Sequence, residues 1–593
     1  MSRAAIAAKV AGILAFVFLT NRFLDLGNRI DTLIHNFGGY RGLVIFGGLW
    51  MVCLAGILAA GFLSRLWLRV LFAAPLLAGA LVGSAYEDVA GSEIDYDQVL
   101  MLRESVSHLG AAIPLYVGSV FGAAVLTLLG ALALLLPLGT VRPAGPRVQP
   151  SQAAVLPRRL RTLLPAWADA PLRRLRTLLP AAAAVIPFVV VPAVIVARGG
   201  YGVGGLPVQH KVPSLFLVAE AAGRLAGVER RPVDLTPVEA STAGPHVVLV
   251  IDDGVRGDYL DLNVDRGTTP ALLRRRDRIV NFGHAVSAAN CSPASNLVPR
   301  TGAMPADLVA GAQTNPYVWR YARQAGMRTA YIHPPGGPAE LARRLSAAER
   351  EQVDRIVVQR GETALARDLH AIETLGELLA ANRRQFVIVM KSGLHSPYEV
   401  VFPADRMPFL PPPGWVHPTA AGLPPGGSYG SAVTWNVDPF FEHLFTTVPL
   451  DDTVLIYTSE HGQDLPGDGA GGMPECSTGN TNPMEGLVPM LAVTERLDWR
   501  SRFDAAAARN LNRTSHFNVL PTLLLLFGYG PEQIAGRFEP SLLDPIEAEY
   551  GFTTGLVTAT PRLVVGPRTR LPLHRIPREI LEQGGRAQVE ADP

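Results

Sequence analysis

Five long apolar segments in the first third of the chain constrain its fold more than any other feature. They are residues 4–20, 42–63, 67–84, 110–138 and 180–197. Each approaches or exceeds the length of about 20 residues that a helix needs to cross a bilayer. The first could be a signal peptide, but no small-residue cleavage site follows it and four more segments do. We therefore predict a membrane domain of five helices over residues 1–198.

The distribution of arginine predicts how these helices are oriented. The segment between the fourth and fifth apolar segments is basic and contains the repeat RRLRTLLPA at 158–166 and 173–181. Its eight arginines are Arg142, Arg147, Arg158, Arg159, Arg161, Arg173, Arg174 and Arg176. Basic loops stay in the cytoplasm, so the acidic loop at 86–98 and the residues after 197 lie outside. The repeat could also be a functional lipid-contacting helix, but a topology determinant resting on anionic lipid is favoured.

This orientation is directly testable. A cysteine introduced at position 150 is expected to react with a membrane-impermeant thiol reagent only after the inner face of the membrane is opened. Labelling of that position from the outer face of intact cells would contradict the predicted topology.

The remaining sequence changes character after residue 198. Residues 199–244 form a predicted linker containing an amphipathic helix over 213–228 that would lie on the membrane surface. Residues 245–593 form a predicted soluble domain with the continuous apolar runs HVVLVI, QFVIVM and TVLIY, which suit strands buried on both faces. Helical patterns separate these runs. The alternation predicts an α/β domain with a central, mostly parallel sheet.

Side chains that can bind a metal or take part in catalysis follow these three predicted strands. They are Asp252, Asp253, Lys391, His395, Glu460 and His461. Ligands bind at the carboxyl ends of the strands of such sheets, so we expect these side chains to share one site. Carboxylates with an imidazole suit a divalent metal such as zinc or manganese. The segment AANCSPASN adds nucleophile candidates in Cys291, Ser292 and Ser295, whose hydroxyls a nearby metal could activate.

Several motifs together resemble the alkaline phosphatase and sulfatase superfamily, and above all its membrane-bound phosphoethanolamine transferases. They are VLVIDDGVRGDYLDLN, TTPALL, NFGHAVSAANCSPASN, KSGLHSPY, YTSEHGQDL and SHFNVLPTLLLLFGY. The resemblance implies a divalent metal, with zinc favoured and manganese or calcium as alternatives. It implies ligands from Asp253, Glu460, His461 and the nucleophile, with Asp252 as a further ligand or a group that orients one. It also implies that Lys391 and His395 contact the phosphoryl group.

The sequence departs from the transferase pattern at three places. The transferases have glutamate at the position of Asp253 and aspartate at the position of Glu460. Asp253 and the Asp252–Asp253 pair are closer to the sulfatases. A further histidine expected about a dozen residues after His461 is missing from LPGDGAGGMPECSTGNTNPMEG.

Two cysteines lie in the outer domain, where disulfides persist, and we predict that Cys291 and Cys476 are bonded to each other. The sulfatase signature C-x-P-x-R lacks its arginine here, so conversion of Cys291 to formylglycine is not expected. In the transferases a cysteine precedes the nucleophile by four residues, which favours Ser295. The superfamily's usual interval from Asp253 points instead to Ser292. Of the two we favour Ser295 as the nucleophile, with Ser292 as the alternative and Cys291 as a structural residue.

The resemblance implies metal-dependent transfer of a phosphoryl headgroup through a covalent serine intermediate, with phosphoethanolamine as the favoured headgroup. The donor would be a membrane phospholipid, and the acceptor lipid A or an envelope glycan. The expected protein is a monomer in the bacterial inner membrane with its catalytic domain in the periplasm. A formal net charge of +2 gives no reason to expect nucleic acid as a partner. The alternatives are a membrane-anchored sulfatase or phosphodiesterase and a catalytically silent scaffold.

Overall fold

The computed structural model divides the chain into two compact units, residues 1–103 with 113–224 and residues 104–112 with 225–593. Apart from isolated residues, it describes residues 3–22, 40–90, 116–136, 169–198, 203–225, 229–238, 244–335, 344–381, 383–396, 427–465, 474–477, 481–554 and 568–571.

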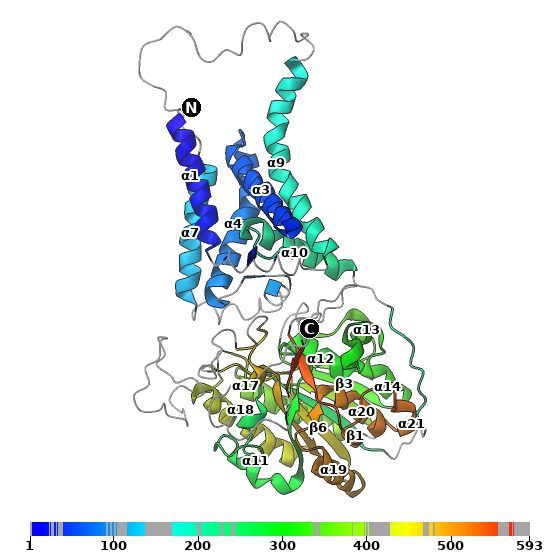
Figure 1. Cartoon of the computed structure of the whole chain (residues 1–593). Helices are drawn as coiled ribbons and strands as arrows, with labels where there is room; N and C mark the ends of the chain where they lie inside the picture. The colour runs from blue at the N-terminus through cyan, green and yellow to red at the C-terminus, as the bar shows by residue number, and fades with distance from the viewer. Residues whose placement is uncertain are drawn as a thin grey trace, which may run out of the picture. The chain divides into compact units, whose positions relative to one another are not determined.

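The first unit contains, within the described residues, five helices long and apolar enough to cross a membrane. They are α1 Arg3–Thr20, α3 Tyr40–Phe62, α4 Leu66–Ala90, α7 Val117–Leu135 and α9 Asp169–Ala197 (Figure 1). These helices confirm the five predicted spans. The helix predicted after them is α10, Val208–Leu225, and it groups with this unit. Its Lys211 is buried, with Nζ 3.5 Å from Glu87 Oε1 and 3.2 Å from Glu93 Oε2.

The second unit is built on an eight-stranded sheet with the order β4-β3-β5-β1-β6-β7-β2-β8. The strands are β1 His246–Asp252, β2 Ile279–Val286, β3 Arg328–His333, β4 Arg355–Val358, β5 Gln385–Met390, β6 Thr453–Ser459, β7 Leu487–Val493 and β8 Thr514–Ser515. Five neighbouring strands, from β4 to β6, run parallel. Strand β7 is antiparallel to both of its neighbours. The sheet confirms the predicted mostly parallel α/β fold.

Helices cover both faces of this sheet. Figure 1 shows α17 and α18 on one side of the strands and α14 and α20 on the other. The helices of the unit are α11 Pro270–Arg274, α12 Ser292–Thr301, α13 Leu308–Thr314, α14 Val318–Gln324, α16 Ala347–Arg350, α17 Ala364–Leu379, α18 Gly427–Thr447, α19 Leu497–Asn510, α20 Val519–Phe527 and α21 Pro531–Ile534. A two-stranded sheet of β9 Gly551–Thr553 and β10 Arg568–Arg570 completes the elements.

Strand β1 shows why its sequence is a continuous apolar run. Val248 and Val250 pack in the core under α17 and α18, while Val247, Leu249 and Ile251 pack in the core under α14, α19 and α20. Successive side chains of a strand point to opposite faces, so a strand covered on both faces has no solvated side.

The topology brings three loops to one edge of the sheet. Strand β1 lies between β5 and β6, with Ile251 opposite Met390 and Asp252 opposite Ser459. The residues that follow, Asp253, Lys391 and Glu460, therefore leave the sheet side by side at its carboxyl edge.

Candidate active site

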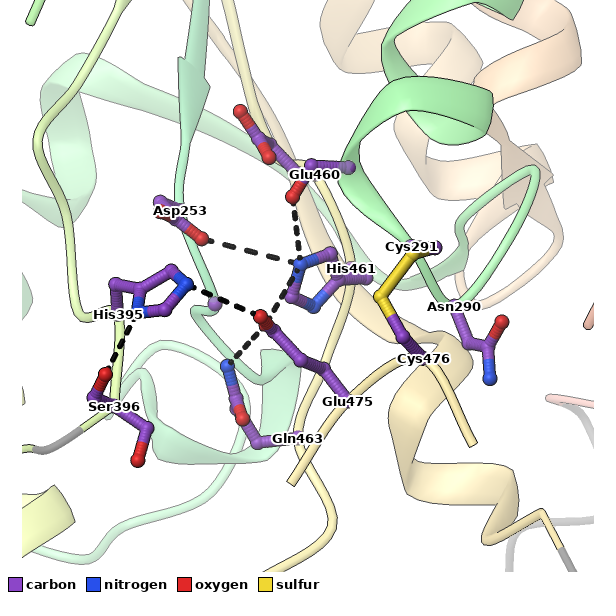
Figure 2. A network of polar contacts seen from close by, with 12 residues as sticks. Asp253, Asn290, Cys291, His395, Ser396, Glu460, His461, Gln463, Glu475 and Cys476 are labelled. Atoms are coloured by element: carbon purple, nitrogen blue, oxygen red, sulfur yellow. Dashed lines mark hydrogen bonds and ion pairs between the residues drawn. A yellow bond between two sulfur atoms is a disulfide. The ribbon is translucent and has the colours of Figure 1, made fainter. Parts of the chain in front are cut away.

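Carboxylate and imidazole groups converge beyond the ends of β1 and β6. Asp253, His461 and Glu475 each offer a ligand atom, and these atoms all lie within 4.8 Å of one another. Nε2 of His461 is 3.0 Å from Oε2 of Glu475 and 3.9 Å from Oδ1 of Asp253 (Figure 2). Two carboxylates and one imidazole at this spacing form a donor set that suits a divalent cation such as zinc.

The loop after β5 adds a second histidine to the cluster. Nε2 of His395 lies 3.3 Å from Oε1 of Glu475, so this carboxylate bridges the two imidazoles. Nδ1 of His461 lies 2.7 Å from the carbonyl oxygen of Gly462. A hydrogen on Nδ1 bonded to that carbonyl would leave Nε2 free to bind a metal, the usual arrangement of a ligating histidine.

The electrostatics of the cluster also fit a cation. Burial raises the pKa of Asp253 to about 7, and the neighbouring charge of Glu460 contributes. Burial alone would lower the pKa of His461, but Glu475 and the other carboxylates raise it to about 10. Burial would raise the pKa of Glu475, but His461 and His395 lower it to about 2. Protons on the imidazoles offset the carboxylate charges here, and a divalent ion would replace them.

One oxygen is left over in this arrangement. Oδ1 of Asp253 is buried and has no hydrogen-bond partner within the part of the chain that the structure describes. Burying such an oxygen without a partner costs free energy, so its position favours a bound cation.

Glu460 lies beside this cluster without belonging to its tightest group. Its backbone N–H donates to the carbonyl oxygen of Asp252 at 2.8 Å, and its side chain is buried near Asp253 and His461 (Figure 2). Among the predicted metal ligands, the structure thus brings Asp253 and His461 together, with Glu460 adjacent and Glu475 as the nearer carboxylate.

Ser292 is the serine that reaches the cluster. It is the first residue of α12, and its Oγ is 3.2 Å from Nε2 of His461. Backbone N–H groups and the helix dipole at a helix N-terminus favour negative charge, which would suit a hydroxyl that acts as a nucleophile.

Ser295, which the cysteine spacing favoured, points elsewhere. It is fully buried, its Oγ donates to the carbonyl oxygen of Glu460, and Nδ1 of His516 is 3.0 Å away. It lies within the first turn of α12, where it faces the end of β6 rather than the cluster. The geometry therefore favours Ser292 over Ser295.

Lys391 and Asp252 lie beneath the site and do not line it. Nζ of Lys391 is 2.5 Å from Oδ2 of Asp252 and 2.9 Å from Oδ1 of Asn436, and the lysine is 1% exposed. Asp252 also accepts a hydrogen bond from the hydroxyl of Tyr457 at 2.7 Å. Asp252 is the last residue of β1 and pairs with Lys391, whereas the next residue, Asp253, belongs to the cluster. The expected contact of Lys391 with a phosphoryl group is therefore not supported by its position.

Glu475 is the site residue that sequence reasoning missed. It stands in the region where a histidine was expected, next to Cys476. The predicted Cys291–Cys476 disulfide is confirmed, with Cα atoms 4.7 Å apart. The cysteine pair was the sequence signal that could have identified Glu475, because the disulfide brings position 475 close to Cys291 and Ser292.

The structure contains an α/β unit with a mostly parallel eight-stranded sheet and a unit whose described residues include five helices long and apolar enough to cross a membrane. The chain is similar in fold to the integral membrane protein lipooligosaccharide phosphoethanolamine transferase A from Neisseria meningitidis. The two match with a TM-score of 0.58 and 17% identity over 90% of this chain and 97% of the other. At this identity the likeness shows the shared fold.

Two other solved structures are less similar. The C-terminal periplasmic domain of EcEptC from Escherichia coli in complex with Zn matches 60% of this chain and 100% of its own, with 18% identity and a TM-score of 0.47. The lipoteichoic acid synthase LtaP from Listeria monocytogenes matches 62% and 94%, with 14% identity and a TM-score of 0.40. No family model and no curated protein sequence matches the chain.

Proposed function

We propose that this protein transfers a phosphoryl headgroup from a membrane phospholipid to lipid A or an envelope glycan, with phosphoethanolamine as the favoured headgroup. The observation that carries the proposal is the placement of the Ser292 hydroxyl at a helix N-terminus, 3.2 Å from His461 and beside Asp253 and Glu475. The whole-length fold likeness to a phosphoethanolamine transferase supports this choice of reaction.

The donor set fits a divalent metal, with zinc favoured over manganese and calcium because an imidazole is among the donors. Asp253, His461 and Glu475 would hold it, with Glu460 and the Ser292 oxygen nearby. When bound, such an ion supplies positive charge that stabilises an alkoxide and the phosphoryl oxygens.

The reaction would proceed in two displacements. Oγ of Ser292 loses its proton and attacks the phosphorus, and the bond from phosphorus to the diacylglycerol oxygen breaks. Diacylglycerol leaves as the alcohol after it takes a proton, and the headgroup remains on Ser292. In the second step an acceptor hydroxyl loses its proton and attacks the same phosphorus, and the bond from phosphorus to Oγ of Ser292 breaks. Oγ then takes a proton, which returns Ser292 to its hydroxyl form.

His395 is placed to assist both steps. Its side chain is 32% exposed, more than those of Glu475, Asp253 and His461, so it is more accessible to solvent than these three. Burial would lower its pKa, but Glu475 and Asp253 raise it above its usual value, which favours the protonated form of the ring. A protonated imidazole there can donate to a phosphoryl oxygen or to the leaving alkoxide.

The membrane helices would contribute by location. A catalytic unit tethered to the inner membrane on its periplasmic side meets lipid donor and lipid acceptor at high local concentration. We propose that the protein acts there as a monomer.

Mass spectrometry of lipids and glycans from cells with and without the protein tests the proposal, and the Ser292→Ala variant is the matched control. The expected result is an acceptor that carries phosphoethanolamine, together with increased diacylglycerol, only with the unchanged protein. Headgroup release without a modified acceptor would favour a sulfatase-like or phosphodiesterase hydrolase. No change in either pool would favour the scaffold.

A further inference from the structure

The single disulfide of the outer unit occupies an unusual position relative to the site. Cys291 directly precedes Ser292, and Cys476 directly follows Glu475. Figure 2 shows the bond beside His461 and Glu475. The disulfide therefore joins the residue before the proposed nucleophile, Ser292, to the residue after Glu475, a carboxylate of the cluster.

The backbone at Cys476 has a conformation that needs support. Its φ is +58°, in the left-handed region that residues other than glycine rarely adopt. Its N–H donates to the carbonyl oxygen of Asn290 at 2.9 Å, and its sulfur is bonded to Cys291. A strained backbone conformation persists only where surrounding contacts hold it. Here the two contacts, the hydrogen bond and the disulfide, come from the adjacent residues Asn290 and Cys291. The conformation of Cys476 also sets the direction in which Glu475 enters the cluster.

A buried carboxylate, Glu485, forms a second tie between the same loops. Its Oε2 accepts from Nδ2 of Asn290 at 2.8 Å and from the backbone N–H of Ser477 at 3.2 Å, and the Ser477 hydroxyl donates to its Oε1. Its carbonyl oxygen accepts from the N–H of Gly462 at 2.8 Å. Glu485 thus connects three segments through hydrogen bonds. They are the segments that contain Ser292, Glu475 and His461.

We propose, building on the metal centre proposed above, that the Cys291–Cys476 disulfide is a positioning element that holds Glu475 against the divalent-metal site. A carboxylate on an untethered loop loses conformational freedom each time it binds a metal, which weakens the binding. The disulfide fixes that loop in advance. The bond thus acts on metal affinity through Glu475, in addition to any general effect on folding.

A double-mutant cycle separates these two roles. Zn²⁺ affinity is measured on the full-length protein in detergent by competition with a chromophoric chelator, for four forms. They are the unchanged protein, Cys291→Ser with Cys476→Ser, Glu475→Ala, and all three changes together. Cys53→Ser is the matched control, because Cys53 is a buried free cysteine in the first unit.

We expect the paired cysteine change to weaken Zn²⁺ binding by about tenfold or more when Glu475 is present, as for other groups that hold a ligand in place. In the Glu475→Ala background the same change should alter affinity less than about twofold, because no carboxylate remains to be positioned. Cys53→Ser should leave affinity unchanged.

An equal loss in both backgrounds would overturn the inference and assign the bond a general structural role. Unchanged affinity after the paired change would overturn it as well. If the unchanged protein binds no Zn²⁺ or Mn²⁺, the proposed metal centre itself fails, and the inference fails with it.

A second variant covers the case in which the cysteine pair does not fold. Asn290→Ala keeps the disulfide but removes the hydrogen bonds to the Ser477 carbonyl and to Glu485. It should weaken Zn²⁺ binding in the presence of Glu475 and have no further effect in its absence. The opposite pattern would count against the inference.

Discussion

Replacing Ser292 with alanine is expected to abolish headgroup transfer, with kcat falling at least about 10³-fold. The change removes the hydroxyl that lies 3.2 Å from His461 Nε2, and the part of the chain that the structure describes places no other serine or threonine hydroxyl in hydrogen-bond contact with that atom. Turnover is measured as release of diacylglycerol from a phospholipid donor in detergent. Bound metal and the thermal unfolding midpoint should stay close to those of the unchanged protein.

The matched variants are Ser292→Thr and Ser295→Ala. Ser292→Thr keeps a hydroxyl at the same helix position and should retain measurable turnover. Ser295→Ala removes the bonds to the Glu460 carbonyl and His516, so it should destabilise the fold by about 1–3 kcal/mol and keep turnover. Loss of turnover in Ser295→Ala with retention in Ser292→Ala would show that the nucleophile is Ser295.

Removal of the metal is expected to have the second large effect. Chelation should lower turnover by about a hundredfold or more, and added Zn²⁺ should restore it, because the ion would offset the charges of Asp253 and Glu475 and stabilise the reacting oxygens. Retention of full turnover after exhaustive chelation would rule out the proposed metal centre.

The pH dependence of Zn²⁺ affinity follows from the same groups. Without metal, the pKa of His461 is about 10 and that of Asp253 about 7, so His461 must release a proton on binding throughout the range from pH 8 to pH 6. Below about pH 7, Asp253 must release a second. Affinity should therefore fall about tenfold from pH 8 to pH 7 and more steeply below. The Asp253→Asn variant should bind Zn²⁺ more weakly, and its affinity should lack the steeper decrease below about pH 7. An affinity independent of pH over this range would contradict the assignment.

Much of the fold follows from local sequence pattern. The five apolar segments and the apolar runs of β1, β5 and β6 are strong signals because each is uniform over its whole length. A strand covered on both faces needs no polar positions, so its sequence alone marks it as central. Short edge elements such as β4 and β8 carry no comparable pattern, and their pairing depends on long-range contacts.

The site was predicted less completely, for physical reasons that differ between residues. Asp253, His395 and His461 follow central strands, so the carboxyl-end rule places them together. The choice between Ser292 and Ser295 depends on where α12 begins, and helix starts are poorly defined by sequence. Glu475 lies in a loop between β6 and β7 and does not directly follow a strand, so in the sequence only the cysteine pair indicates that it could reach the site.

The adjacent acids at the end of β1 have a consequence for how this chain can vary. Asp253 belongs to the carboxylate and imidazole cluster, and Asp252 neutralises the buried ammonium of Lys391. Deleting or inserting one residue in β1 would exchange the two faces, so that each carboxylate would meet the wrong partner. Conservative exchanges of one apolar residue for another in β1 are therefore tolerable, whereas the number of residues in that strand is not free to change.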